Sequence, residues 1–174
     1  AIRDQIEMMN QQAMAAALQN AVTQAYSEQA TAMINMKAAQ GEYHRAVERT
    51  NNFYATWGGS ISEVNALMGT NYKTVGECVK GLGGWTGATA EQTEQARVLY
   101  NKLVDLTGIE AENKQAVSDS LIEYMGAKNA YDEASLAAEG YEYAMQEAIK
   151  TGDYSADSIG KNYDKIVHKS NEMK

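Results

Sequence analysis

Histidine and cysteine, the residues that most often hold metals or act as nucleophiles, are rare in this sequence. There are two histidines, and His44 stands one helical turn before Glu48, a spacing that could bring an imidazole and a carboxylate to one metal ion. A di-iron carboxylate bundle would also need repeated Glu-x-x-His units on facing helices, and the sequence has none. We therefore interpret His44 and Glu48 as part of a solvated helix face.

Cys78 is the only cysteine, so no disulfide can form within the chain. It would be a nucleophile only beside a base, and no motif supplies one. Residues 81–87 (GLGGWTG) have the glycine content of a phosphate-binding loop but lack the lysine and Ser/Thr that follow such a loop. We interpret Cys78 as a packed thiol and residues 81–87 as a hinge or contact loop. The sequence thus predicts no catalytic residue, no metal ligand and no cofactor.

Long helices must carry these residues, because apolar and small residues recur at alternating spacings of four and three, the seam of a coiled coil. The first seam contains Leu18, Val22, Ala25, Gln29, Ala32, Met36, Ala39, Tyr43, Ala46, Thr50, Phe53 and Trp57. The second contains Val117, Ser120, Tyr124, Ala127, Tyr131, Ala134, Ala138, Tyr141, Met145 and Ala148. We expect the two seams to cover each other, with Leu18, Val22, Met36 and Tyr43 against Tyr131, Ala134 and Tyr141.

The first helix is expected to end at Trp57, because two glycines follow it and each costs about 1 kcal/mol in a helix relative to alanine. Three pairs with the spacing of a capping box then predict new helix starts. These pairs are Ser60 with Glu63, Thr74 with Glu77, and Thr89 with Gln92, and they predict helices over about 61–68, over about 75–81 and from about 90 onward.

The second half of the chain is predicted to be one long helix that ends at a glycine. Gly108 is expected to break or kink it, and Gly152 has the position of a C-terminal cap. A last helix is expected over about 156–172. The resulting fold is all-α: an elongated bundle of two to three long helices with a small glycine-rich helical appendage. Its divisions are a long helix over 1–57, the appendage over 58–88 and returning helices over 89–174.

Composition supports this architecture and excludes several classes of partner. There is no proline, although average usage is about 5%. The net charge of -8 argues against nucleic acid, which requires a basic surface. No apolar run approaches the roughly 18 residues that span a bilayer, so no transmembrane segment is expected.

The alanine-rich seams bury little area, so we expect further burial against protein partners, most simply other copies of the chain. Residues 10–29 are polar but almost uncharged, which suits contacts between identical helices. Methionines can form adaptable binding surfaces, and five lie in the first helix: Met8, Met9, Met14, Met33 and Met36. The candidate interface residues are Leu18, Val22, Met36, Tyr43, Trp57, Trp85, Tyr131 and Tyr141.

Residues 55–63 (ATWGGSISE) resemble the turn of the small helical-hairpin proteins exported by type VII secretion. Those proteins carry a Trp-x-Gly turn between two helices, and Trp57 with Gly59 matches it. The family's export signal, Tyr-x-x-x-Asp/Glu, has the spacing of Tyr143 and Glu147. The chain is longer than members of that family and has a third long segment.

The order of a long helix, a small helical appendage and returning long helices also resembles the minor pilins of type IV secretion pili, by analogy of layout alone. Proline-free helices rich in Ala and Gln occur as well among bacteriophage core and tail proteins. We therefore expect a non-enzymatic assembly protein that acts as an oligomer, an exported component of a bacterial secretion or pilus-type apparatus. A bacteriophage virion protein is the alternative. An extracellular or periplasmic apparatus or a virion is the expected location.

Overall fold

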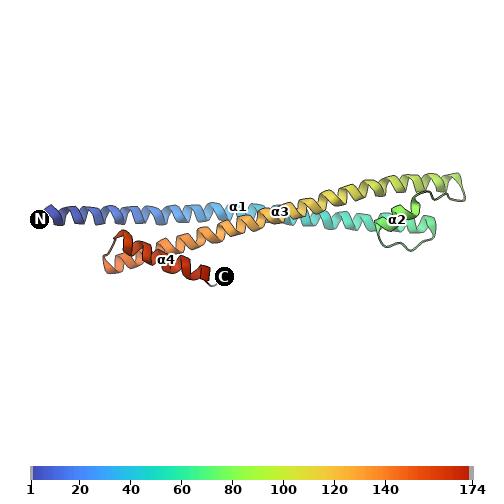
Figure 1. The fold of residues 1–174 in the computed structure, drawn as a ribbon. Coiled ribbons are helices and arrows are strands. Elements are labelled where there is room, and N and C mark those ends of the chain that lie inside the picture. Colours follow the sequence, from blue (N-terminus) through green and yellow to red (C-terminus); the bar gives the residue numbers. More distant parts are fainter. Residues whose placement is uncertain (1, 173–174) are drawn as a thin grey trace. The chain divides into compact units, whose positions relative to one another are not determined.

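The computed structural model describes residues 2–172, and the side chains of residues 2–168, as four helices and no strands. The helices are α1 (Ile2–Met68), α2 (Val75–Leu82), α3 (Ala90–Thr151) and α4 (Ala156–Glu172) (Figure 1). The predicted all-α class is therefore correct. The long helices α1 and α3 pack against each other in opposite directions, joined by the segment that contains α2.

The chain divides into two compact units, and each long helix contributes to both. Unit 1 contains residues 1–39 and 123–174, which include the first part of α1, the second part of α3 and α4. Unit 2 contains residues 40–122, which include the rest of α1, α2 and the start of α3.

Alanine fills most of the helix contacts in unit 1. The Nε2 of Gln29 donates to Oγ of Ser135 at 3.0 Å, and the Tyr26 hydroxyl donates to the Glu142 carboxylate. These two bonds fix an antiparallel register that places Leu18 about level with Ala148. The buried side chains of unit 1 are Leu18, Val22, Ala25, Ala138, Ala144 and Ala148.

Helix α4 packs on α3 at a glycine. A Cβ added to Gly140 would lie 2.8 Å from the ring of Tyr163, which is closer than such atoms approach, so only glycine leaves room for this tyrosine. The rings of Tyr141 and Tyr163 also contact each other, with centroids 4.6 Å apart. Close backbone approach, rather than a large apolar core, thus seats α4.

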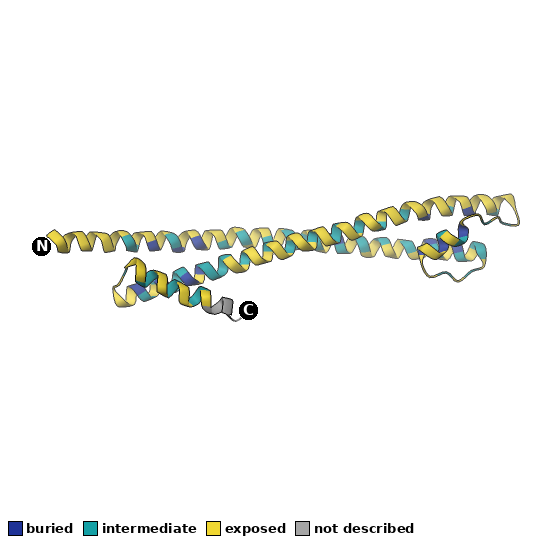
Figure 2. Ribbon diagram, in the orientation of Figure 1, coloured by how far each residue is buried: buried dark blue, intermediate teal, exposed yellow. Residues whose placement is uncertain are grey.

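Unit 2 has a core of larger side chains where α2 meets the two long helices. Its buried members are Val64 of α1, Val75, Cys78 and Leu82 of α2, and Ala96 and Leu103 of α3. The three α2 residues follow a spacing of three and four, so one face of this short helix is apolar. Figure 2 shows the buried residues of α2 at this junction.

The helix expected to end at Trp57 continues to Met68, so the predicted break at Gly58 and Gly59 is wrong. Neither glycine has a positive φ, and an added Cβ would meet nothing within 4 Å at either position. Ser60 is 2% exposed inside the helix and caps nothing. Packing of this turn against α2 and α3 outweighs the glycines' helix propensity, which is only a weak preference.

Most of the other helix boundaries agree with the sequence. Gly69 and Gly152 follow helix ends with φ of 67° and 75°. Thr74 caps α2, its Oγ1 accepting from the Glu77 amide at 3.1 Å, and Oγ1 of Thr89 accepts from the Gln92 amide at 3.2 Å before α3. The expected break at Gly108 is absent, since α3 continues to Thr151.

Candidate interaction site

Both predicted seams are covered by the chain's own helices. None of the twelve positions of the first seam or the ten of the second is exposed. Leu18 is 4% exposed and Val22 9% exposed, and they lie about level with Ala148 and Ala144. Met36, Tyr43, Tyr131 and Tyr141 are half-buried. The surface left for a partner must therefore lie mainly outside the seams.

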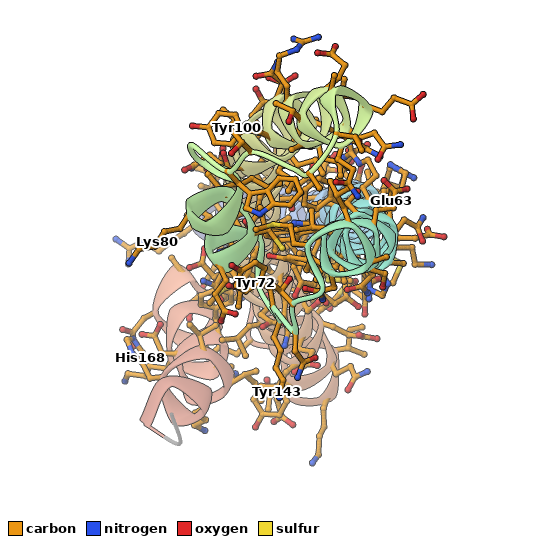
Figure 3. All side chains as sticks on the ribbon, turned by 90° about the vertical axis from the view of Figure 1, so that its right-hand side faces the viewer. Glu63, Tyr72, Lys80, Tyr100, Tyr143 and His168 are labelled. Carbon is orange, nitrogen blue, oxygen red and sulfur yellow. The ribbon has the colours of Figure 1, made fainter. Side chains whose placement is uncertain are left out.

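The end of unit 2 is one such surface, because three helices meet there and leave grooves between them. Figure 3 looks onto this end, with Glu63 of α1, Lys80 of α2 and Tyr100 of α3 pointing outward from their shared core. The groove between α1 and α3 has a volume of about 680 Å³. Its lining combines apolar and polar side chains: Ala66, Leu67, Val98 and Leu99 with Glu63, Gln92, Glu94 and Gln95.

The second groove places Trp85 at the surface of unit 2. It has a volume of about 440 Å³ and lies between α3 and the turn after α2. Trp85 is half-buried against the core, and Arg97 and Tyr100 form part of the facing wall. The glycine-rich segment here is tightly turned: Gly84 has a φ of 77°, and the Trp85 amide donates to the Leu82 carbonyl at 3.0 Å.

The segment before α2 is tied to α1 by one asparagine. The Asn65 side chain donates to the Tyr72 carbonyl at 2.9 Å and accepts from the Tyr72 amide at 2.8 Å. It also accepts from the Thr70 hydroxyl at 2.9 Å. A Cβ at Gly81 would lie 2.3 Å from the Tyr72 hydroxyl oxygen, so a larger residue there would displace the Tyr72 ring. The appendage is therefore held in place by specific contacts that no sequence motif indicates.

Trp57 lies beside these helices in a cluster of aromatic rings on α1. Tyr54 stacks on it with centroids 5.2 Å apart, and the Tyr54 hydroxyl donates to Glu110 at 3.0 Å. Partial burial and then this bond raise the pKa of Tyr54. The indole Nε1 of Trp57 and the hydroxyl of Ser60 are buried without a hydrogen-bond partner. Trp57 thus serves packing within unit 2.

The first turns of α1 form a second uncovered surface, which belongs to unit 1. Every residue from Ile2 to Ala13 is exposed (Figure 2). Because Leu18 is about level with Ala148 and α3 ends at Thr151, these turns lie beyond the reach of α3. Four large apolar side chains are uncovered here: Ile2, Ile6, Met8 and Met9, at 75%, 55%, 62% and 68% exposure.

Sequence reasoning missed Ile2 and Ile6, and it treated Met8 and Met9 only as part of a methionine group. The signal was available, because Ile2, Ile6 and Met9 follow the same spacing of four and three on a face adjoining the first seam. Met33 is 37% exposed, and Met14 and Met36 are half-buried, so the methionines do not share one surface.

The side chains that could act as nucleophiles or metal ligands do not lie together. Cys78 is 0% exposed, and burial, with a smaller effect of Glu77, raises the pKa of its thiol. His44 is exposed, and no group of three His, Cys, Asp or Glu side chains among the described residues could hold a metal ion.

Within the part of the chain that the structure describes, no helix combines the length and apolarity needed to cross a bilayer.

No family model, no curated protein and no solved structure matches this chain.

Proposed function

We propose that this protein is a non-enzymatic helical assembly protein that acts as an oligomer. The observation that carries the proposal is the uncovered stretch Ile2–Ala13, where four large apolar side chains have no cover from the chain's own helices. Exposed apolar surface of this kind on a helix is typical of a protein–protein contact.

The buried thiol of Cys78 and the solvated His44 favour a role without catalysis.

The setting that we propose is an exported component of a bacterial secretion or pilus-type apparatus. Its support is the layout, in which α1 leads to the small helix α2 and α3 returns, as in the minor pilins of type IV secretion. A bacteriophage virion protein is the second candidate. The observation that favours it is the uncharged, Ala- and Gln-rich stretch of α1 over residues 8–27, which would pack well in a ring or tube of identical subunits.

The solution mass, measured by light scattering after size exclusion over a hundredfold range of concentration, tests the oligomer. We expect a defined multiple of 19.0 kDa at the higher concentrations. A mass of one copy throughout that range would contradict the proposed function. Electron microscopy of the multimer then separates rings and tubes from small closed oligomers.

A further inference from the structure

The uncovered turns of α1 present one continuous face that differs from the seam starting at Leu18. Its positions repeat the spacing of four and three, and every one of them is exposed: Ile2, Ile6, Met9, Ala13, Ala16 and Asn20. We refer to these six residues as the outer N-terminal face. Its first three members are large and apolar, and the next two are alanines that would let another helix approach closely.

Charge identifies the kind of partner that this face fits. The twenty residues 8–27 carry no charge, although at the chain's 22% of charged residues about four would be expected. Each copy has a net charge of -8, so two copies repel each other unless they meet over uncharged surface. A basic partner would instead be favoured by acidic residues at the contact, and residues 8–27 have none. The partner that suits this stretch is a second copy of the chain.

We propose that two copies associate through their outer N-terminal faces, with the two α1 helices antiparallel. In the register that pairs Ile6 with Ala16 and Met9 with Ala13, these two large side chains of one copy meet alanines of the other, and Ile2 lies opposite Asn20. Antiparallel coiled coils pack in such layers, and large residues facing small ones fill them evenly. The inference rests on the proposed function, because it names the partner as another copy.

The charged residues favour the antiparallel orientation over the parallel one. Arg3, Asp4 and Glu7 are the only charges in the first 27 residues. In the proposed register they lie opposite positions 15–19 of the other copy, which are uncharged. A parallel pair would place each charged residue beside the same residue of the other copy, and like charges at such a contact are unfavourable.

Two substitutions on the face and one matched control test the contact. Ile6→Asp and Met9→Asp place a charge within it, whereas Ile34→Asp places one at a residue of α1 outside the face whose 68% exposure equals that of Met9. We expect each of the first two to weaken association at least tenfold and the third to leave it unchanged. Because all three side chains are exposed, far-ultraviolet circular dichroism should be the same for all.

The outcomes separate this inference from the proposed function. A wild-type chain that remains a single copy at every concentration contradicts both. A wild-type multimer that both face variants leave unchanged overturns the N-terminal contact and leaves the oligomer in place. A loss of association in Ile34→Asp equal to that in Met9→Asp also overturns the contact, because charge anywhere on α1 would then suffice.

Cross-linking with a short bis-maleimide tests the orientation. Met9 of one copy lies close to Met9 of the other in the antiparallel register, whereas the two Ile2 residues lie about 27 Å apart, eighteen residues at about 1.5 Å each. We expect Met9→Cys to give cross-linked dimers and Ile2→Cys to give none, with wild type as the control, since its Cys78 is buried. Dimers from both variants would overturn the antiparallel orientation, and dimers from neither would overturn the pairing.

Discussion

The two units of this chain bring helices together by different means. In unit 2, leucine, valine and cysteine side chains from three helices meet in a core, with Leu103 and Cys78 fully buried. In unit 1 most of the buried residues are alanines, and Gly140 leaves the room that lets helix α4 pack against α3. The same long helices, α1 and α3, take part in both arrangements.

The difference shows two sources of stability: the buried apolar area of large side chains and the close approach of helix backbones. Each buried apolar group contributes roughly 25 cal/mol per Å², so alanine contacts contribute little individually. They instead allow the helices to approach closely, and the contact then depends on the absence of larger side chains. Unit 2 should therefore be sensitive to removing atoms, and unit 1 to adding them.

The largest expected effect is the loss of a leucine from the core of unit 2. Leu103→Ala leaves a cavity among large neighbours and should cost about 4 kcal/mol, whereas Leu18→Ala, beside alanines in unit 1, should cost about 2 kcal/mol. Amide hydrogen exchange resolves the two units and measures each loss locally. Equal losses at the two positions would contradict the proposed difference between the units.

The converse change tests unit 1. Ala144 is 0% exposed, and Ala144→Leu should separate α1 from α3 at a cost of about 2 kcal/mol. Ala111→Leu is a suitable control, because Ala111 is an exposed position of the same helix. Urea denaturation gives the free energy of unfolding of both variants. If Ala144→Leu left that free energy unchanged, the helices would not be closely packed at this alanine.

Gly140 tests how α4 is seated. Gly140→Ala places a methyl group 2.8 Å from the Tyr163 ring, and we expect a loss of about 1 kcal/mol and greater exchange of the α4 amides. Gly126→Ala, in the same helix, meets nothing within 4 Å and should instead raise stability by about 0.5–1 kcal/mol. If both substitutions stabilised the protein, α4 would not depend on close approach to Gly140.

The sequence was sufficient for the helical class, for both seams and for most helix ends, because these depend on local periodicity and capping. Thr74 and Thr89 cap as expected since their hydroxyls need only an amide three residues ahead. The contacts of Asn65 with residues 70 and 72 have no periodic pattern, so sequence reasoning could not find them. The break expected at Trp57 failed because tertiary packing outweighed two unfavourable residues.

The helix break predicted at Gly58 and Gly59 can be tested by the sign of the stability change at Ser60. If Ser60 began a helix, Ser60→Ala would cost about 1 kcal/mol. In the structure its buried hydroxyl has no partner, so Ser60→Ala should be neutral or stabilising by up to about 1 kcal/mol. Gly58→Ala and Gly59→Ala should each stabilise by about 1 kcal/mol, because nothing obstructs the added methyl group. Thermal melts of the three variants measure these effects. Destabilisation by all three would support the predicted end of the helix at Trp57.

The smallest expected effect is the alkaline pH dependence that the Cys78 thiol confers on unit 2. Burial raises the pKa of this thiol above its usual value, so the folded state holds the proton more tightly than the unfolded chain. Its contribution is complete below about pH 9 and is lost as the pH rises through the folded pKa. Stability should therefore fall more steeply above pH 9 in wild type than in Cys78→Ala, because tyrosine ionisation is common to both. Urea midpoints for the two proteins between pH 7 and 10.5 check this, and parallel curves would mean that the thiol ionises as easily in the folded protein as in the unfolded chain.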